Sequence, residues 1–246
     1  MLIPSERHTA ADLGLWAEQE AADLAHAKTA SFREKLVAAE HAVASFAASG
    51  PCYCSVSWGK DSVVLAHVVA TYNARWPAPA QIPFIWVTVG DLDAGCRDVR
   101  DHFLTLWPNP YREIAVEAGE RTDRGTAGKR NGFRLAEREF GPRRLIGIRG
   151  TESGGRKISA RTWGVESVNA CRPLLWWSVA DVFAALACFG LPVHPNYAML
   201  GGGRWPRHHL RTAPLAGKRG DQFGRAEWEA EYYGDILRRL QVRPIS

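Results

Sequence analysis

The sequence lacks the features that mark secreted, membrane-spanning or zinc-finger proteins. Its five cysteines, among 246 residues, are odd in number and scattered, and no two form a Cys-x-x-Cys pair. That spacing argues against a disulfide framework and against a zinc site built mainly from thiolates. No stretch approaches the roughly 18 uninterrupted apolar residues of a membrane span. The N-terminus carries Glu6 and Asp12 in an alternating polar pattern unlike a signal peptide, so we expect a cytoplasmic protein without a membrane partner.

Histidine and cysteine also give no pattern typical of a bound metal. His194, His208 and His209 are flanked by prolines and arginines, without an accompanying Cys/Asp cluster. No cysteine follows Cys188, and none of the five has the paired spacing of cluster ligands. We therefore predict no zinc site at these histidines and no iron–sulfur cluster.

The charge is small in total but uneven along the chain. The net charge is +5, yet residues 121–161 hold twelve Lys or Arg against four Asp or Glu, whereas residues 1–49 are acidic. A basic block in the middle of a chain commonly faces a polyanion, here nucleotide phosphates, nucleic acid or both. A solvated basic face is the alternative.

The spacing of apolar residues predicts helices alternating with strands. Helical spacing fills residues 9–49, up to the stop signal Ser49-Gly50-Pro51. Beyond it, strands are predicted at 52–57, 84–89, 112–116 and 145–149, and helices at 62–73, 92–107 and 178–189. Such alternation forms right-handed βαβ units and a parallel sheet, so the predicted fold class is α/β.

Composition divides the chain into three parts. Residues 1–49 are predicted as an N-terminal helical extension, residues 50–190 as a nucleotide-binding α/β domain, and residues 191–246 as an irregular, basic C-terminal segment rich in Arg, Gly and Pro. We expect the last part to be a lid or a docking surface. Within the central part, residues 125–131 (GTAGKRN) are predicted as a flexible basic loop.

The stretch Ser55–Ser62 (SVSWGKDS) lies between the first predicted strand and its helix. Backbone N–H groups and the helix dipole receive phosphate at such a place. It fails the Walker A pattern, because Gly59-Lys60 is followed by Asp61 and Cys54 stands where the first glycine belongs. Lys60 suits the neutralisation of phosphate charge, and Asp61 suits orientation of the loop or a Mg²⁺ ion that bridges phosphates.

Four motifs, in order, resemble those of the PP-loop ATP pyrophosphatases. Ser57-Trp58-Gly59-Lys60-Asp61-Ser62 is similar to their Ser-x-Gly-Lys/Gly-Asp-Ser signature, and its lysine favours the phosphoadenosine phosphosulfate (PAPS) reductase branch. The other three motifs of that branch lie at residues 145–153 (LIGIRGTES), 172–183 (RPLLWWSVADVF) and 191–197 (LPVHPNY). The resemblance covers about residues 50–215.

The resemblance implies a five-stranded parallel sheet of the adenine nucleotide alpha hydrolase type, with helices on both faces. It also implies cleavage of ATP at the α-phosphate into AMP and pyrophosphate, with AMP transferred to an acceptor oxygen, and ATP and Mg²⁺ as cofactors. One setting of this branch is sulfur transfer to nucleic acid, as in DNA phosphorothioate modification.

Two departures limit what the resemblance carries over. Members that reduce PAPS use a C-terminal cysteine, which this sequence lacks, so that reductive route is not expected. The family often has Asp-Thr-Gly after the second strand, whereas this chain has Thr88-Val89-Gly90. Cys171, before the third motif, is a candidate persulfide carrier or a core residue.

The candidate site residues follow from the motifs. We assign catalytic roles to Lys60, Asp61, Arg149 and Glu152, where Glu152 is a Mg²⁺ ligand or an orienter of Lys60. The candidate nucleotide-binding residues are Ser57, Trp58, Gly59, Ser62, Val89, Gly90, Gly150, Ser153 and Arg156. The candidate lid or substrate residues are Arg204, Arg207, His208 and Arg211.

Several partners remain open on the sequence alone. The basic tail suits either enclosure of the nucleotide or contact with nucleic acid, where arginines meet phosphates and aromatics stack. Beyond ATP or a related adenine nucleotide, candidate partners are nucleic acid, a sulfur-donor protein and a second copy of the chain. Alternative functions are a PAPS- or APS-binding reductase or transferase that uses a partner's thiol, and a nucleotide-sensing or DNA-binding module without turnover.

Overall fold

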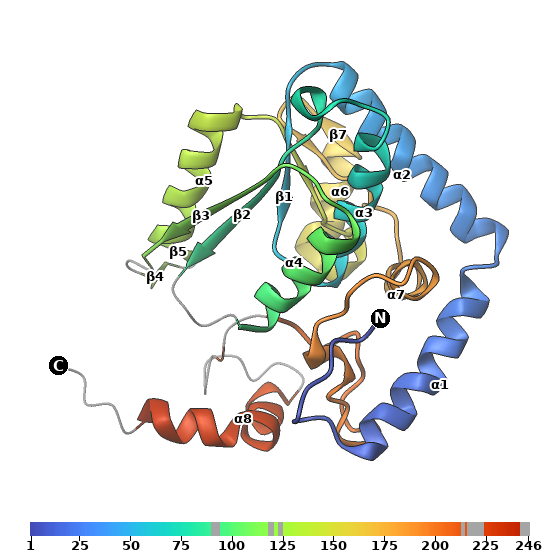
Figure 1. Cartoon of the computed structure of the whole chain (residues 1–246), viewed down its shortest axis with the longest axis vertical. Coiled ribbons are helices and arrows are strands. Elements are labelled where there is room, and N and C mark those ends of the chain that lie inside the picture. Colours follow the sequence, from blue (N-terminus) through green and yellow to red (C-terminus); the bar gives the residue numbers. More distant parts are fainter. Residues whose placement is uncertain (90–93, 118–120, 123–124, 213–214, 216–223, 242–246) are drawn as a thin grey trace.

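The computed structural model describes residues 1–89, 94–117, 121–122, 125–212, 215 and 224–241, and it has the predicted α/β architecture. A central sheet lies between helices, the two N-terminal helices run along one side, and the last helix lies below the sheet in the view of Figure 1. None of the described helices is both long and apolar enough to cross a membrane.

The sheet has the strand order β3-β2-β1-β6-β8-β7. Its strands are β1 (Tyr53–Val56), β2 (Phe84–Val89), β3 (Tyr111–Val116), β6 (Arg144–Ile146), β7 (Glu166–Ser167) and β8 (Ala170–Cys171). The first five in this order pair in parallel, as predicted, and the edge strand β7 pairs antiparallel with β8. The difference from a five-stranded sheet is thus one short edge strand, which makes a hairpin with β8.

The predicted helices are present with shifted ends. They are α1 (Ala10–His26), α2 (Ala30–Ala48), α3 (Lys60–Asn73), α4 (Ala94–Leu106) and α7 (Val179–Cys188). The helix α3 begins two residues earlier than expected, because Gly59 supplies the extended N-cap conformation. Short 3-10 turns lie at η1 (Ala78–Ala80), η2 (Gly150–Glu152), η3 (Pro195–Ala198) and η4 (Gly201–Gly203).

Three helices were not predicted. The stretch 125–131 is not a flexible loop: β5 (Gly125–Thr126) pairs with β4 (Arg121–Thr122), and α5 (Ala127–Phe140) begins directly after it. The helix α6 (Gly154–Trp163) follows the Gly-x-Arg-x-x-Glu-Ser motif. The C-terminal segment, expected to be irregular, contains α8 (Arg225–Gln241). Tertiary packing explains the first case, because Ala136 of α5 is fully buried against β1, β2 and β3 in a core cluster with Tyr53, Ile85 and Ile114.

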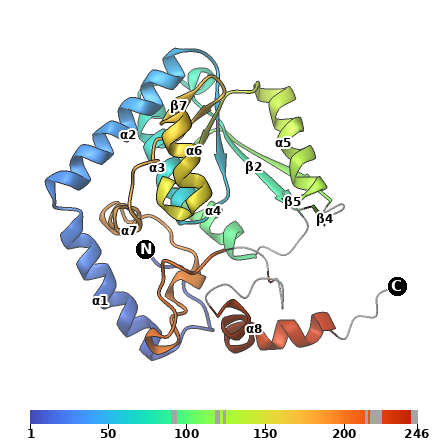
Figure 2. The same cartoon turned by 180° about the vertical axis from the view of Figure 1, so that it is seen from behind.

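The two faces of the sheet are covered unequally. On one face α3 packs against β1, α2 and α7, and α5 covers β2 and β3 on the other. The contact of α5 is close, because a Cβ at Gly132 would lie 2.3 Å from a methyl carbon of Val87. In Figure 1 α6 lies behind α3, and in the view from behind it lies in front of α3 (Figure 2).

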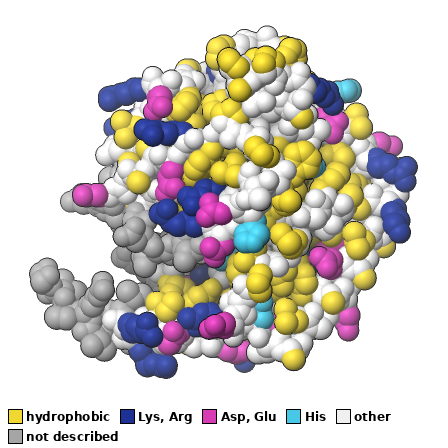
Figure 3. Space-filling model, in the orientation of Figure 1, with side chains coloured by type: hydrophobic (Ala, Val, Ile, Leu, Met, Phe, Trp, Pro, Cys, Tyr) yellow, Lys and Arg dark blue, Asp and Glu magenta, His cyan; other side chains and the backbone are white. Residues whose placement is uncertain are grey.

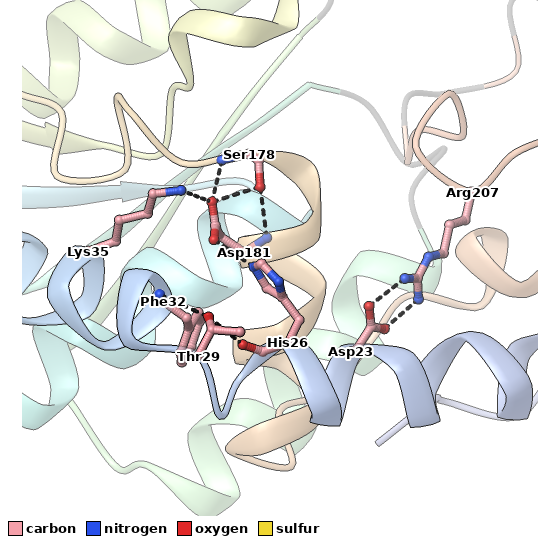
Figure 4. A network of polar contacts seen from close by, with 8 residues as sticks. All are labelled: Asp23, His26, Thr29, Phe32, Lys35, Ser178, Asp181 and Arg207. Carbon is pink, nitrogen blue, oxygen red and sulfur yellow. Dashed lines mark hydrogen bonds and ion pairs between the residues drawn. The ribbon is translucent and has the colours of Figure 1, made fainter.

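The N-terminal helices are fixed to the domain by buried polar contacts. Asp181, in the first turn of α7, has a fully buried side chain that accepts hydrogen bonds from His26 at 2.9 Å and from Lys35 at 2.7 Å. Ser178, the N-cap of α7, donates to the same carboxylate (Figure 4). One helix of the domain is therefore bonded to both α1 and α2.

The C-terminal segment also belongs to the core. Trp205, Leu210, Trp228 and Tyr232 are all buried in the cluster that includes the helices over the first face. The indole N–H of Trp228 donates to the carbonyl of Met199 at 2.8 Å. This part of the chain is packed and hydrogen-bonded rather than loosely attached.

Candidate functional site

The strand order marks a candidate ligand site between β1 and β6. From β1 the chain continues through α3 to β2 and then β3 on one side, whereas β6 lies on the other side of β1. Ligands of open parallel sheets bind at the carboxyl ends of the strands where the order reverses in this way. The loop after β1 contains Ser57 to Gly59, and the segment after β6 contains Arg149.

The loop from Ser57 to Gly59, which we call the candidate phosphate loop, has an unusual backbone conformation. Trp58 has φ +57°, and it is the one described residue other than glycine in the left-handed region. The N–H of Ser57 donates to the hydroxyl of Ser62 at 3.0 Å, which closes the loop over the start of α3. A Cβ on Gly59 would lie 3.3 Å from the Thr212 hydroxyl oxygen and 3.5 Å from that of Tyr197, so the loop has little room for a side chain there.

The side chain of Trp58 is in the core and not in the site. Its indole is fully buried, with its ring centroid 5.5 Å from that of Phe103 and 6.1 Å from that of Tyr111. Only the backbone of Trp58 therefore lies at the candidate site, and its indole packs in the core and holds the loop in place.

Three of the four residues assigned catalytic roles form one cluster of charges. Asp61 accepts from the Lys60 ammonium at 3.0 Å and from the Arg149 guanidinium at 2.5 Å. The Lys60 and Arg149 side chains are only 8% and 6% exposed, so this is a buried cluster rather than a surface pair. Burial lowers the pKa of Lys60, but the neighbouring Tyr197 and Asp61 outweigh burial and leave the pKa above the ordinary lysine value. Lys60 is therefore a cation at neutral pH.

A glycine that the candidate list omitted makes this meeting possible. A Cβ at Gly147 would lie 3.0 Å from the carbonyl oxygen of Asp61 and 3.2 Å from Cα of Ser62, both of them backbone atoms. Any larger residue would push the end of β6 away from α3. This glycine belongs to the stretch Leu-Ile-Gly-Ile-Arg, of which only the arginine was predicted as a site residue.

Glu152, the fourth, lies at the edge of this cluster. Its carboxylate is 3.6 Å from Arg149 and forms an ion pair with Arg156 one helical turn later. Ser153 is committed to the N-cap of α6, where its hydroxyl accepts the N–H of Arg156. Burial lowers the pKa of Arg156, and the nearby charges of Arg211 and Arg149 act in the same direction against the effect of Asp61.

Gly150 has a packing role. It is buried, its N–H donates to the carbonyl of Leu175 at 2.8 Å, and a Cβ there would lie 3.1 Å from Cβ of Ala160. Val89 ends β2 at the same edge of the sheet and pairs with Val116. Gly90 lies outside the described residues.

The candidate lid residues separate into two pairs. Arg207 forms a two-fold ion pair with Asp23 of α1, at 2.5 and 2.6 Å, and its guanidinium lies 3.9 Å from the ring centroid of Phe183 (Figure 4). Arg204 pairs with Glu231 at the surface. Both are therefore occupied in holding the C-terminal segment.

His208 and Arg211 lie nearer to the cluster. Burial lowers the pKa of His208, and the charges of His209, Arg207 and Lys60 lower it further. The charge of Arg211 acts on Arg156. Thr212 is a further neighbour of the cluster, beside Gly59, and it belongs to none of the four motifs.

Two of the buried cysteines, Cys52 and Cys171, are not activated thiols. Burial raises the pKa of Cys52 to about 11 and that of Cys171 to about 12. A nucleophilic cysteine needs a lowered pKa, because the thiolate is the reactive form. Cys171 therefore suits the core rather than persulfide chemistry, and Cys188 is exposed.

Within the described part of the chain, no group of three or more His, Cys, Asp or Glu side chains is arranged to hold a metal ion. Among the described residues, the acidic side chains at the candidate site are Asp61 and Glu152, and both are paired with cations. Mg²⁺ is often held by one or two carboxylates together with substrate phosphates, so the donor set here suits an ion that arrives with a nucleotide.

No family model matches the sequence, and no curated protein matches it either. Among solved structures, the FMN adenylyltransferase of Candida glabrata is similar, with a TM-score of 0.52 and 16% identity, covering 76% of this chain and 67% of that one. The phosphoadenylyl-sulfate (PAPS) reductase of Candida auris, in a phosphate complex, has a TM-score of 0.48 and 14% identity over 66% and 84%. The U34-tRNA thiolase NcsA of Methanococcus maripaludis, solved with its 4Fe-4S cluster, has a TM-score of 0.43 and 14% identity over 79% and 74%.

At such low sequence identities these similarities show the fold alone. That conclusion rests on the match to the adenylyltransferase, with its TM-score of 0.52. This chain has the adenine nucleotide alpha hydrolase-like fold that its motifs predicted, so the resemblance to the PP-loop proteins is confirmed at the level of the fold.

Proposed function

We propose that this protein is an ATP pyrophosphatase that transfers AMP to an acceptor oxygen. The observation that carries the proposal is the buried cluster of Lys60, Asp61 and Arg149, where α3 begins beside the end of β6. A helix N-terminus with two buried cations favours a polyphosphate, since the N–H groups, the dipole and the cations act together. Asp61 keeps the cations paired until the nucleotide phosphates replace it as their partner.

In this proposal each residue has a defined position relative to ATP. The Lys60 ammonium and the N–H groups of α3 that follow Lys60 bind the β- and γ-phosphates, and Arg149 and Arg156 lie near the α-phosphate. The acceptor oxygen attacks the α-phosphorus, and the bond to the bridging oxygen breaks, so that its electron pair leaves with pyrophosphate. A sulfur or nitrogen nucleophile then displaces AMP from the activated acceptor. Mg²⁺, bound mainly by the phosphates, would supply further neutralisation of charge.

The acceptor that we propose is a substrate of sulfur transfer, with nucleic acid as one candidate. The tRNA thiolase among the similar structures is an enzyme of that kind. Support from the basic tail is weaker than its composition suggested, because Arg204 and Arg207 are paired with Glu231 and Asp23. On the face shown in Figure 3, basic and acidic side chains are interspersed.

A second candidate is a protein that handles PAPS or APS and takes its thiol from a partner. Because Cys52 and Cys171 are buried and have raised pKa values, they are poor nucleophiles, and a partner's thiol suits this function better. The site cations would then bind the sulfonucleotide phosphates.

One experiment separates these functions. The protein is incubated with ATP and Mg²⁺, and separately with PAPS and a dithiol, and the products are identified by chromatography. Release of AMP and pyrophosphate from ATP supports the proposal, and release of sulfite from PAPS supports the second candidate. Nucleotide binding without either product would contradict both and favour a sensing module.

A further inference from the structure

Tyr197 lies directly against the candidate phosphate loop, although 137 residues separate it from Lys60. Its hydroxyl accepts the backbone N–H of Lys60 at 3.3 Å, and the Lys60 ammonium lies 5.2 Å from the centroid of its ring. One side chain thus contacts the same lysine at both ends. Tyr197 is only 3% exposed, so these contacts are made in the interior.

The two contacts and the ion pair with Asp61 define where the Lys60 ammonium lies. The ring of Tyr197 is one neighbour of the ammonium and the Asp61 carboxylate, at 3.0 Å, is another. A lysine side chain has four rotatable bonds and loses much conformational freedom when it is held in one place. Fixing it before the nucleotide binds reduces that loss at the time of reaction.

The position of Tyr197 is itself set by the C-terminal helix. The neighbouring residue, Asn196, accepts a hydrogen bond from the Tyr233 hydroxyl of α8 at 2.5 Å and donates to the carbonyl of Arg211 at 3.2 Å. The helix α8 departs from helical geometry at Tyr233, where φ is −130°. On its other side the ring of Tyr197 meets the ring of Phe183 of α7 edge-on, with centroids 5.9 Å apart.

We infer that Tyr197 is a positioning residue for Lys60, and that α8 fixes Tyr197 through the hydrogen bond between Tyr233 and Asn196. This inference rests on the proposed function for its kinetic test, although the placement of Lys60 can also be measured without turnover. The C-terminal helix thereby contributes to the placement of Lys60.

Two conservative substitutions test the inference. Tyr197→Phe keeps the ring beside the Lys60 ammonium and removes the hydroxyl that accepts the backbone N–H of Lys60. Loss of such a hydrogen bond is expected to lower kcat for pyrophosphate release about tenfold, with KM changed less than about twofold. Tyr233→Phe removes the hydroxyl bound to Asn196, and about a threefold loss in kcat is expected, since the effect passes through one further residue.

The chain offers a matched control on the same helix. The hydroxyl of Tyr232 donates to Asp12 at 2.8 Å and accepts the N–H of Gly201 at 2.7 Å, so it binds α1 and η4 and not η3. Tyr232→Phe should lower the melting temperature without lowering kcat. A loss of kcat in Tyr232→Phe equal to that in Tyr233→Phe would overturn the proposed path, and so would wild-type kcat in Tyr197→Phe.

The second readout needs no catalysis. The backbone N–H of Lys60, which donates to the Tyr197 hydroxyl, is followed by proton–nitrogen NMR and amide hydrogen exchange in the wild type, Tyr197→Phe and Tyr232→Phe. Loss of its acceptor should speed the exchange of this amide about fivefold and shift its resonance, and Tyr232→Phe should match the wild type. If the wild type releases no pyrophosphate but this change is present, the proposed function fails while the positioning role holds. An unchanged Lys60 amide in Tyr197→Phe overturns the role itself.

Discussion

Asp61 neutralises two buried cations in the structure, so each residue around it is coupled to the others. Lys60 and Arg149 share the carboxylate, and Arg149 also donates to the hydroxyl of Thr151 at 3.1 Å. Removing Lys60 leaves Asp61 with one cation, whereas removing Asp61 leaves two buried cations side by side. The first change is therefore the cleaner test of the site.

Lys60→Ala should abolish most ATP turnover while the protein stays folded. We expect a loss of roughly 100-fold or more in kcat/KM, the size found when one group that stabilises transition-state charge is removed. The measurement is pyrophosphate release, together with circular dichroism and the melting temperature. Because Lys60 is buried, a modest fall in melting temperature is expected as well.

Lys157→Ala is the matched control, since Lys157 is an exposed lysine of α6. It has no ion pair with the described residues, and its loss should leave kcat/KM unchanged. Full activity in Lys60→Ala, or an equal loss in both variants, would contradict the proposed role of Lys60.

Arg207→Ala should destabilise the fold and leave nucleotide affinity unchanged. The Arg207 and Asp23 side chains are 14% and 6% exposed, so the change leaves a buried carboxylate without its cation. The expected cost is about 2–4 kcal/mol of unfolding free energy, measured by urea denaturation. This differs from the role of a nucleotide lid that the basic tail suggested.

Arg204→Ala is the corresponding control. Its pair with Glu231 is half exposed on both sides and should contribute less than about 1 kcal/mol. A weaker nucleotide affinity in Arg207→Ala, with unchanged stability, would restore the lid interpretation.

At the scale of elements, the domain depends on how α1 and α2 are fastened to α7. Burial would raise the pKa of Asp181, but hydrogen bonds from Lys35, His26 and Ser178 outweigh it and lower the pKa to about 2, from an ordinary 3.8. The carboxylate is thus more stable in the folded chain than in the unfolded one.

Acid should loosen this contact in a defined pH range. A carboxyl group whose pKa is lowered by folding stabilises the fold above its unfolded pKa, and that contribution is lost as the pH falls from about 4 to about 2. Asp181→Asn should therefore be less stable at pH 6 and lose less further stability on acidification. Urea denaturation at pH 6, 4 and 3 measures both effects.

Asp101→Asn serves for comparison, because Asp101 is 62% exposed and pairs only with Arg100 of the same helix in the described contacts. Its dependence on pH should match that of the wild type. If Asp181→Asn also kept the wild-type pH dependence, the network at α7 would not be the source of acid sensitivity.

At the scale of the whole molecule, the first residues of the chain contact the last described helix. Arg7 donates to Asp235 and to the carbonyl of Tyr232, and the Tyr232 hydroxyl donates to the buried Asp12. The N-terminus itself donates to the carbonyl of Leu191. These contacts join residues that lie about 190 to 230 positions apart, so the N-terminal residues and α8 belong to one packed structure.

A chain that ends at residue 223 should therefore be much less stable than one that ends at residue 241. The shorter chain loses the buried Trp228 and Tyr232, and Asp12 keeps no tyrosine partner. A fall of more than about 10 °C in melting temperature is expected, since each kcal/mol corresponds to about 2–4 °C for a protein of this size. Equal melting temperatures would show that α8 contributes nothing to the packing.

The local elements and the chemistry of the loop could be predicted from the sequence. The apolar run of β2, the stop at Ser49-Gly50-Pro51 and the loop from Ser57 to Ser62 were predictable, because each depends on neighbours within a few residues. The helix α5 was not, since its first residues are Gly-, Lys- and Asn-rich and it is stabilised by burial against the sheet. In α8, Trp228 and Tyr232 stand four residues apart, a spacing typical of one buried helix face, so this helix was predictable as well.

Which charged residues gather at the candidate site depends on contacts between distant parts of the chain. Arg149 meets Asp61 across 88 residues, Arg207 is taken away from the site by Asp23 across 184, and Tyr197 reaches Lys60 across 137. Sequence spacing says nothing about such pairs, because a cation binds whichever carboxylate the packing brings within about 3 Å. The motifs indicate which residues are candidates for binding phosphate. The packing of α1, α7 and α8 determines which of these candidates lie beside the loop from Ser57 to Gly59.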